Sequence, residues 1–179
     1  VPFVTVLTDM ADHPPHFWIE PGQRQHLVCG TPKAVAQARA AGYANSQISL
    51  TSGMILRPAF YRSSHIDRDA VRRSLGLDPT LPTGVVMFGG QGSMAMLEIA
   101  RRLDAVQLVL LCGHHAQLAD ALRRLPSSAA RAVVGYTADV RRHLMLGDFF
   151  IGKPGPGCLS EAIQQGLPVL VRPAPGEVD

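Results

Sequence analysis

A glycine-rich turn near the end of the chain joins an apolar strand to a helix. The strand expected at residues 149–151 is followed by a turn through Gly155, Pro156 and Gly157, and a helix is expected at residues 158–165. Such a turn aims backbone N–H groups and the positive end of the helix dipole at an anion. Glu161, expected in the first helical turn, could accept from a sugar hydroxyl. The segment therefore predicts a nucleotide-sugar site, although an ordinary turn without a ligand has the same composition.

A second glycine-rich turn, Gly89-Gly90-Gln91-Gly92-Ser93, follows an expected strand and precedes an expected helix. Its small residues would let the backbone approach a diphosphate, and Gln91 or Ser93 could donate hydrogen bonds to it. A tight turn that needs positive φ explains the same glycines. The dinucleotide fingerprint GxGxxG is absent, so the turn alone is a weak signal.

Polar side chains also follow the first expected strand. Asp9, His13 and His16 lie beyond its carboxyl end, where α/β sheets place ligands. No HxH or HxxxH pattern frames them, so we expect no metal site. The neighbouring Phe17 and Trp18 add apolar surface that suits either a lipid acceptor or the core.

The elements that position these residues alternate between strands and helices. An aperiodic stretch at residues 51–67 separates two such series, and near-continuous apolar strands indicate parallel sheets covered on both faces. We expect one domain at residues 1–58 and a second at residues 59–179. The expected strands are 3–7, 25–29, 47–50, 85–88, 106–111, 132–134, 149–151 and 168–171, and the expected helices are 32–42, 67–75, 93–103, 116–125, 138–146 and 158–165.

Composition narrows the class of protein. The chain has 179 residues, 46% hydrophobic and 17% charged, which is typical of a globular protein. Its net charge of +3 suits an anionic nucleotide or an anionic lipid surface, and it lacks the aromatic–basic interleaving that binds nucleic acid. There is no run long enough to span a membrane and no signal peptide, and the three separated cysteines suit a reducing cytoplasm. Both ends lie close to strands, so we expect a piece of a longer protein.

Five segments in order carry a family resemblance. They are TDMADHPPHFW, SGMILRPAF, FGGQGS, GYTADV and KPGPGCLSEAIQQGLPVLV. Together they resemble the monogalactosyldiacylglycerol synthases and the related transferase that adds N-acetylglucosamine in peptidoglycan synthesis. The resemblance implies an α/β fold of the GT-B type, with two Rossmann-like domains, parallel sheets and an N-terminal domain that is incomplete in this chain. It also implies an inverting glycosyltransferase that uses a UDP-sugar.

The same resemblance assigns expected roles to individual residues. The arginine next to the donor diphosphate corresponds to Arg57, and Asp9, His13 and His16 fall on the acceptor side. Backbone groups at Gly135, Tyr136 and Thr137 would face the uracil, and Thr137 could also cap the next helix. The remaining donor-binding candidates are Gly90, Gln91, Gly92, Ser93, Gly155, Pro156, Gly157, Cys158 and Glu161.

The leading prediction is transfer of a hexose from a UDP-sugar to a diacylglycerol-like lipid. We expect no cofactor, no metal, no nucleic-acid partner, and a cytoplasmic protein that contacts the inner face of an anionic membrane peripherally. The family's glycine-rich loop with a histidine, which would carry the general base, does not occur in these 179 residues. We therefore expect this chain alone to be inactive. The alternatives are a UDP-sugar-binding module whose catalytic half is another polypeptide, a transferase with a different acceptor, and a UDP-sugar epimerase of similar architecture.

Overall fold

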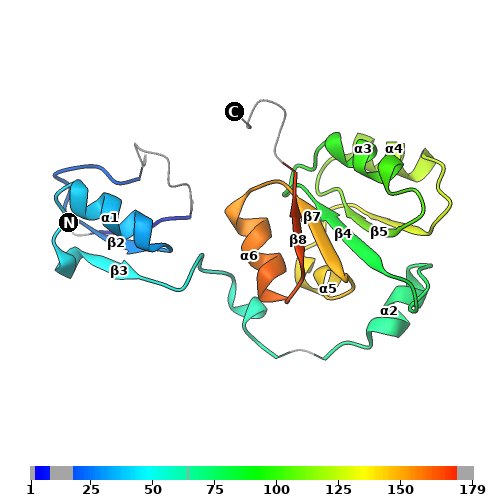
Figure 1. Cartoon of the computed structure of the whole chain (residues 1–179), viewed down its shortest axis with the longest axis horizontal. Coiled ribbons are helices and arrows are strands. Elements are labelled where there is room, and N and C mark those ends of the chain that lie inside the picture. The colour runs from blue at the N-terminus through cyan, green and yellow to red at the C-terminus, as the bar shows by residue number, and fades with distance from the viewer. Residues whose placement is uncertain (1–2, 9–17, 64, 173–179) are drawn as a thin grey trace. The chain divides into compact units, whose positions relative to one another are not determined.

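The chain divides into two compact units, each with its own parallel sheet. The computed structural model describes residues 3–8, 18–63 and 65–172 (Figure 1). Unit 1 comprises Val1–Arg57 and unit 2 comprises Pro58–Asp179. The strands of one unit do not join the sheet of the other, in agreement with the expected pair of parallel sheets. Within the described residues, no helix is long and apolar enough to cross a membrane.

Unit 1 is a three-stranded sheet with one helix. Strands β1 (Phe3–Val6), β2 (Gln25–Cys29) and β3 (Ile48–Leu50) pair in that order, and helix α1 (Pro32–Ala40) connects the last two. The helix starts as its sequence predicts, because the Thr31 side chain accepts a hydrogen bond from the Ala34 N–H and Pro32 fits the first turn. The hydrophobic core of unit 1 includes Leu27, Ala34 and Ala38.

Unit 2 contains a five-stranded sheet in the order β6-β5-β4-β7-β8, and all its pairs are parallel. Helices α3 and α4 lie on one face of this sheet and α5 and α6 on the other (Figure 1). The strands are β4 (Thr83–Met87), β5 (Gln107–Leu111), β6 (Arg131–Val134), β7 (Phe149–Gly152) and β8 (Val169–Val171), and the helices are α2 (Arg68–Ser74), α3 (Ala95–Arg102), α4 (Ala116–Arg124), α5 (Val140–Leu144) and α6 (Pro156–Gln164).

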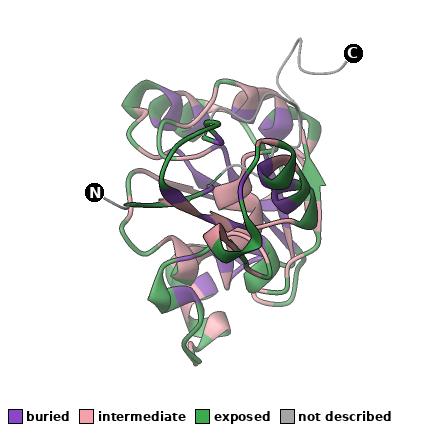
Figure 2. Cartoon of the chain, turned by 90° about the vertical axis from the view of Figure 1, so that its left-hand side faces the viewer, coloured by how far each residue is buried: buried purple, intermediate pink, exposed green. Residues whose placement is uncertain are grey.

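The core of unit 2 lies along its central strands. Every residue of β4 and β5 is buried, which explains why both sequences are apolar beyond their first residues, Thr83 and Gln107. Figure 2 colours such buried residues purple. Met96 and Leu118 cover the strands from α3 and α4, and both are fully buried. The 3-10 turns Asn45–Gln47 and Pro58–Phe60 complete the regular structure.

The starts of α2, α3, α5 and α6 differ from the sequence prediction by one or two residues, and those of α5 and α6 bear on the site. Helix α6 begins at Pro156, two residues earlier than expected, because the fixed φ of proline suits the first helical position. Glu161 therefore lies in the second turn and not in the first. Asp139, and not Thr137, caps α5: its carboxylate accepts from the Arg142 N–H, whereas the Thr137 hydroxyl accepts from the N–H of Asp139 itself.

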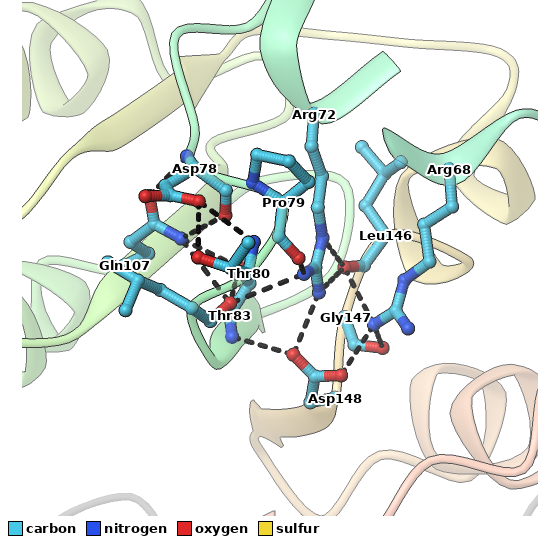
Figure 3. Close-up of polar contacts among 11 residues, drawn as sticks. Arg68, Arg72, Asp78, Pro79, Thr80, Thr83, Gln107, Leu146, Gly147 and Asp148 are labelled. Atoms are coloured by element: carbon cyan, nitrogen blue, oxygen red, sulfur yellow. Dashed lines mark hydrogen bonds and ion pairs between the residues drawn. The ribbon is translucent and has the colours of Figure 1, made fainter. Parts of the chain in front are cut away.

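Charged and polar side chains join the amino ends of three strands of unit 2 (Figure 3). We call this cluster the amino-end network; its members are Arg68, Arg72, Asp78, Thr83, Gln107 and Asp148. Arg72 is only 3% exposed, and its guanidinium donates to the Leu146 carbonyl at 2.6 Å and to the Asp148 carboxylate at 2.7 Å. The Thr83 N–H donates to the same carboxylate at 2.8 Å. The network thereby attaches α2 to the sheet.

Candidate nucleotide-sugar site

A cavity of about 210 Å³ opens at the carboxyl ends of β4, β5 and β6. This is the edge at which parallel sheets place ligands. Its wall is formed mainly by loop backbone and small or apolar side chains, with a single carboxylate. The lining residues are Met87, Gly89, Gly90, Leu111, Gly113, Gly135, Tyr136, Thr137, Val140, Cys158 and Glu161.

Two glycine loops contact each other in the wall of this cavity. The His114 N–H donates to the Gly90 carbonyl at 2.8 Å. Gly113 has φ +59°, and a Cβ atom there would lie 2.1 Å from the Gly90 oxygen, so no other residue fits. Gly89 also has positive φ and starts a turn in which the Gly92 N–H donates to its carbonyl at 3.2 Å. The loops after β4 and β5 therefore hold each other in place.

Helix α6, which follows the glycine-rich turn after β7, differs from the other helices at its first residues. Four of the six α-helices of the described chain begin with a side-chain cap, from Thr31, Asp67, His115 and Asp139. No described side chain caps α6. At the start of α3 the Ser93 hydroxyl accepts from the Ala95 N–H, and the Ser93 and Met94 carbonyls accept from the next two N–H groups. Of the two helix starts for which the sequence predicts phosphate contacts, α6 therefore keeps its first N–H groups available to a ligand or water.

The thiol of Cys158 and the carboxylate of Glu161 line the cavity wall near each other. Burial raises the pKa of the Cys158 thiol, and the nearby charge of Glu161 raises it further. The Gly89 backbone and the Lys153 charge act in the opposite direction without cancelling the shift. Cys158 is therefore a thiol at neutral pH, and Glu161 can supply the acceptor oxygens of the wall.

The structure brings six of the predicted donor residues to the cavity: Gly90, Gly135, Tyr136, Thr137, Cys158 and Glu161. Gln91, Gly92 and Ser93 are not among its described lining residues. Gly92 packs against the Cys112 carbonyl, to which a Cβ would come within 2.6 Å, and the Ser93 hydroxyl accepts from the Ala95 N–H at 3.2 Å. Gly155, Pro156 and Gly157 form the start of α6, beside the lining residue Cys158.

The remaining predicted residues belong to unit 1 or lie outside the described residues. Arg57 is an exposed residue at the end of unit 1, which is described by itself. Asp9, His13 and His16 lie outside the described residues. Among the residues that the structure describes, no three His, Cys, Asp or Glu side chains gather as a metal site. Cys29, Cys112 and Cys158 are all free, as their spacing predicts.

Sequence reasoning missed one aromatic contact at the rim. The His114 ring stacks on the Tyr136 ring, with centroids 4.1 Å apart and planes 20° apart. His114 thereby supports a wall residue, and His115 caps α4 through Nδ1. The position of both directly after the Gly113 turn was the available signal.

Comparison with solved structures defines the class of fold. The chain aligns with Anabaena HepE, solved in complex with UDP-glucose, over 95% of its length at 18% identity and a TM-score of 0.60. It aligns with WaaG, a glycosyltransferase of lipopolysaccharide biosynthesis, over 86% of its length at 20% identity and a TM-score of 0.55. The chain thus has the GT-B glycosyltransferase fold. It covers 53% and 45% of those two chains.

Comparison of sequences then identifies relatives within this class of fold. The chain is 31% identical, over 96% of its length, to a probable monogalactosyldiacylglycerol synthase 2 of rice, and 29% identical over 94% to monogalactosyldiacylglycerol synthase 2 of Arabidopsis thaliana. The resemblance expected from the five sequence segments is therefore confirmed. The chain spans 38% of the length of each of these relatives. No protein-family model matches it.

Proposed function

We propose that unit 2 binds the UDP-sugar donor of a glycosyltransferase. The observation that carries this proposal is the cavity at the carboxyl ends of β4, β5 and β6. It combines two interlocked glycine loops, the uncapped start of α6 and the carboxylate of Glu161. The uncapped helix start suits a diphosphate, Glu161 suits the hydroxyls of a ribose, and the peptide groups of Gly135–Thr137 suit the polar edge of uracil.

We propose further that the whole protein transfers a hexose to a diacylglycerol-like lipid with inversion. The names of the sequence relatives support the galactolipid reaction. In this reaction the start of α6 would stabilise the negative charge that develops on the departing UDP. A general base outside these 179 residues would deprotonate the acceptor hydroxyl. We propose that no divalent metal is needed where helix dipoles and cations hold the diphosphate.

A lipid acceptor also implies contact with a membrane surface. We propose a cytoplasmic protein that binds peripherally to anionic lipid, a proposal supported by the net charge of +3. Flotation with vesicles tests this proposal. The protein should float with phosphatidylglycerol vesicles at low salt and remain in the bottom fraction of the gradient with phosphatidylcholine vesicles. Equal flotation with both would contradict an electrostatic contact.

Calorimetry with this chain tests donor binding directly. UDP-glucose, UDP-galactose and UDP-N-acetylglucosamine should each bind, and UDP should compete with them, because the proposed contacts are mostly to the nucleotide. ADP-glucose is the matched control, since it keeps the diphosphate and the sugar but replaces uracil. Binding of ADP-glucose as tightly as UDP-glucose would contradict the uracil assignment. Absence of binding by UDP and by all three UDP-sugars would overturn the proposed function.

A further inference from the structure

We propose that Lys153 is a diphosphate-binding residue of this site. The inference rests on the proposed function, because it concerns how the same cavity holds a UDP-sugar. Lys153 directly follows the last residue of β7 and precedes the start of α6. It is one of two lysines in the chain, the other being Lys33 in unit 1. The sequence prediction did not include it among the donor-binding residues.

The side chain of Lys153 lies over the two glycine-rich turns. A Cβ atom on Gly155 would lie 3.1 Å from the Lys153 Cε, 3.6 Å from its Cγ and 3.8 Å from its Cδ. A Cβ atom on Gly89 would lie 3.8 Å from the same Cε. The aliphatic stem therefore follows the backbone of Gly155, and its end reaches the turn after β4. The Cε atom that carries the ammonium group therefore lies next to both turns.

The backbone of Gly155 shows why this contact matters for the sequence. Its φ of −83° and ψ of 129° are accessible to any residue, so its conformation does not require glycine. Residues that cap helices with their side chains, such as Ser or Asp, would be more usual at this position. The close approach of the Lys153 stem supplies a reason for glycine, since a side chain at residue 155 would displace the lysine. A side-chain cap would also occupy the N–H groups at the start of α6.

The charge balance of the cavity points to the same residue. Among its described lining residues, Glu161 is the only one charged at neutral pH, and it is negative. A UDP-sugar brings a diphosphate, whereas the start of a helix contributes only about half a positive charge. A cation is therefore needed to balance the anion. Lys153 makes no ion pair with any described residue, and its charge acts on Cys158 in the cavity wall.

An exposed lysine is ordinarily a solvated surface group, so the test must detect the phosphate contact itself. Calorimetry compares UDP, UMP and uridine as ligands of the parent chain, Lys153→Gln, Lys153→Arg and the control Lys33→Gln. We expect Lys153→Gln to weaken UDP binding about ten-fold and to leave uridine binding unchanged. Lys153→Arg should restore most of the UDP affinity, and Lys33→Gln should match the parent.

The outcomes separate this inference from the proposed function. If the parent and Lys153→Gln bind UDP equally, Lys153 is not a diphosphate-binding residue although the donor site stands. If the parent binds no UDP, both proposals fail. If Lys153→Gln weakens uridine as much as UDP, the variant has altered the wall and the phosphate assignment is wrong.

A measurement on the parent chain avoids dependence on the folding of a variant. Reductive methylation labels both lysines, and mass spectrometry of proteolytic peptides reports each one separately. We expect UDP to slow methylation of Lys153 several-fold while Lys33 reacts at an unchanged rate, and uridine to protect neither. Equal reactivity of Lys153 with and without saturating UDP would overturn the inference.

Discussion

The five-stranded sheet of unit 2 carries charged side chains at its amino ends and glycine backbone at its carboxyl ends. In the amino-end network, buried Arg72 donates to the Leu146 carbonyl and to Asp148 (Figure 3). At the opposite edge, Gly90 and Gly113 touch each other and the adjacent helix α6 begins without a side-chain cap. At one end the charged side chains hydrogen-bond mainly to one another and to backbone carbonyls, whereas at the other end backbone N–H groups at the start of α6 lie beside a cavity that Glu161 lines. The comparison separates residues that stabilise the fold from residues available to a ligand.

The largest expected effect comes from breaking the amino-end network. Arg72→Leu should lower the free energy of unfolding by about 3 kcal/mol, because it removes the buried Arg72 donors to the Leu146 carbonyl and the Asp148 carboxylate and leaves the partly exposed Arg68 as their only guanidinium donor among the described residues. Urea denaturation measures this change. Arg73→Leu, an exposed neighbour on the same helix, should stay within about 0.5 kcal/mol of the parent. UDP affinity of folded Arg72→Leu should be unchanged; a matching loss of affinity would contradict the separation of the two ends.

A smaller loss of stability should follow from Gly113→Ala at the carboxyl ends. The added Cβ meets the Gly90 oxygen at 2.1 Å in a backbone with positive φ, so we expect a loss of about 2 kcal/mol together with weaker UDP binding. Gly76→Ala is the matched control, because Gly76 has φ +74° but no atom within 4 Å of the added Cβ. It should cost about 1 kcal/mol and leave UDP binding unchanged. Equal effects of the two variants on affinity would refute the role of the loop contact.

Glu161→Ala tests the cavity at the carboxyl ends of the strands without changing the packing of the sheet. We expect UDP affinity to fall about ten-fold, which corresponds to the loss of one hydrogen bond to a charged acceptor, while the thermal midpoint changes little. Calorimetry at constant pH measures the affinity. Glu161→Gln keeps one acceptor oxygen and should lie between the parent and the alanine variant. Unchanged UDP affinity in Glu161→Ala would exclude Glu161 as a ribose ligand.

The smallest expected effect is the loss of folding stability when Asp148 is protonated at low pH. Burial alone would raise the pKa of Asp148, but hydrogen bonds from the Thr83 N–H, Arg72 and Arg68 outweigh it and hold the pKa below its ordinary value of 3.8. The unfolded chain therefore binds this proton first, so the contribution of Asp148 is complete above pH 3.8 and decreases as the pH falls toward the folded-state pKa.

Because the Asp148 side chain is 39% exposed, we expect this contribution to be under about 1 kcal/mol. Urea denaturation at pH 6 and at pH 3 measures it as the difference in pH dependence between the parent and Asp148→Asn. Asp120→Asn, in the exposed ion pair with Arg123, should show the pH dependence of the parent. An Asp148→Asn variant with the same pH dependence as the parent would contradict the assignment.

The regular elements were predictable because they rest on local patterns. The continuous apolar sequence of β5 and the Thr31-Pro32 start of α1 both correspond to elements that the structure contains. Helix α6 was placed two residues late because Gly157 was assigned to the turn, although Pro156 already favours a helical start.

Long-range polar contacts were not predictable in the same way. Arg72 lies in a charged helix and its sequence neighbours indicate exposure, yet it is buried by Leu146 and Asp148, more than seventy residues away. Similarly, glycine after β4 and β5 suggested two turns, but their contact depends on a register that only the sheet defines. Gly135, Tyr136 and Thr137 came from the resemblance and not from any local pattern, and the structure places them at the cavity.

The strand order of unit 2 has a consequence for the time course of folding. Strands β4, β5 and β6 follow one another in the sequence and pair side by side, whereas β4 pairs on its other edge with β7. The contact between Thr83 and Asp148 closes a loop of 65 residues. Closing so long a loop costs chain entropy before it is compensated by contacts, so the half-sheet β4-β5-β6 should assemble first. The amino-end network then forms only when β7 pairs with β4. Its hydrogen bonds should therefore affect mainly the unfolding rate of unit 2 and only weakly its folding rate.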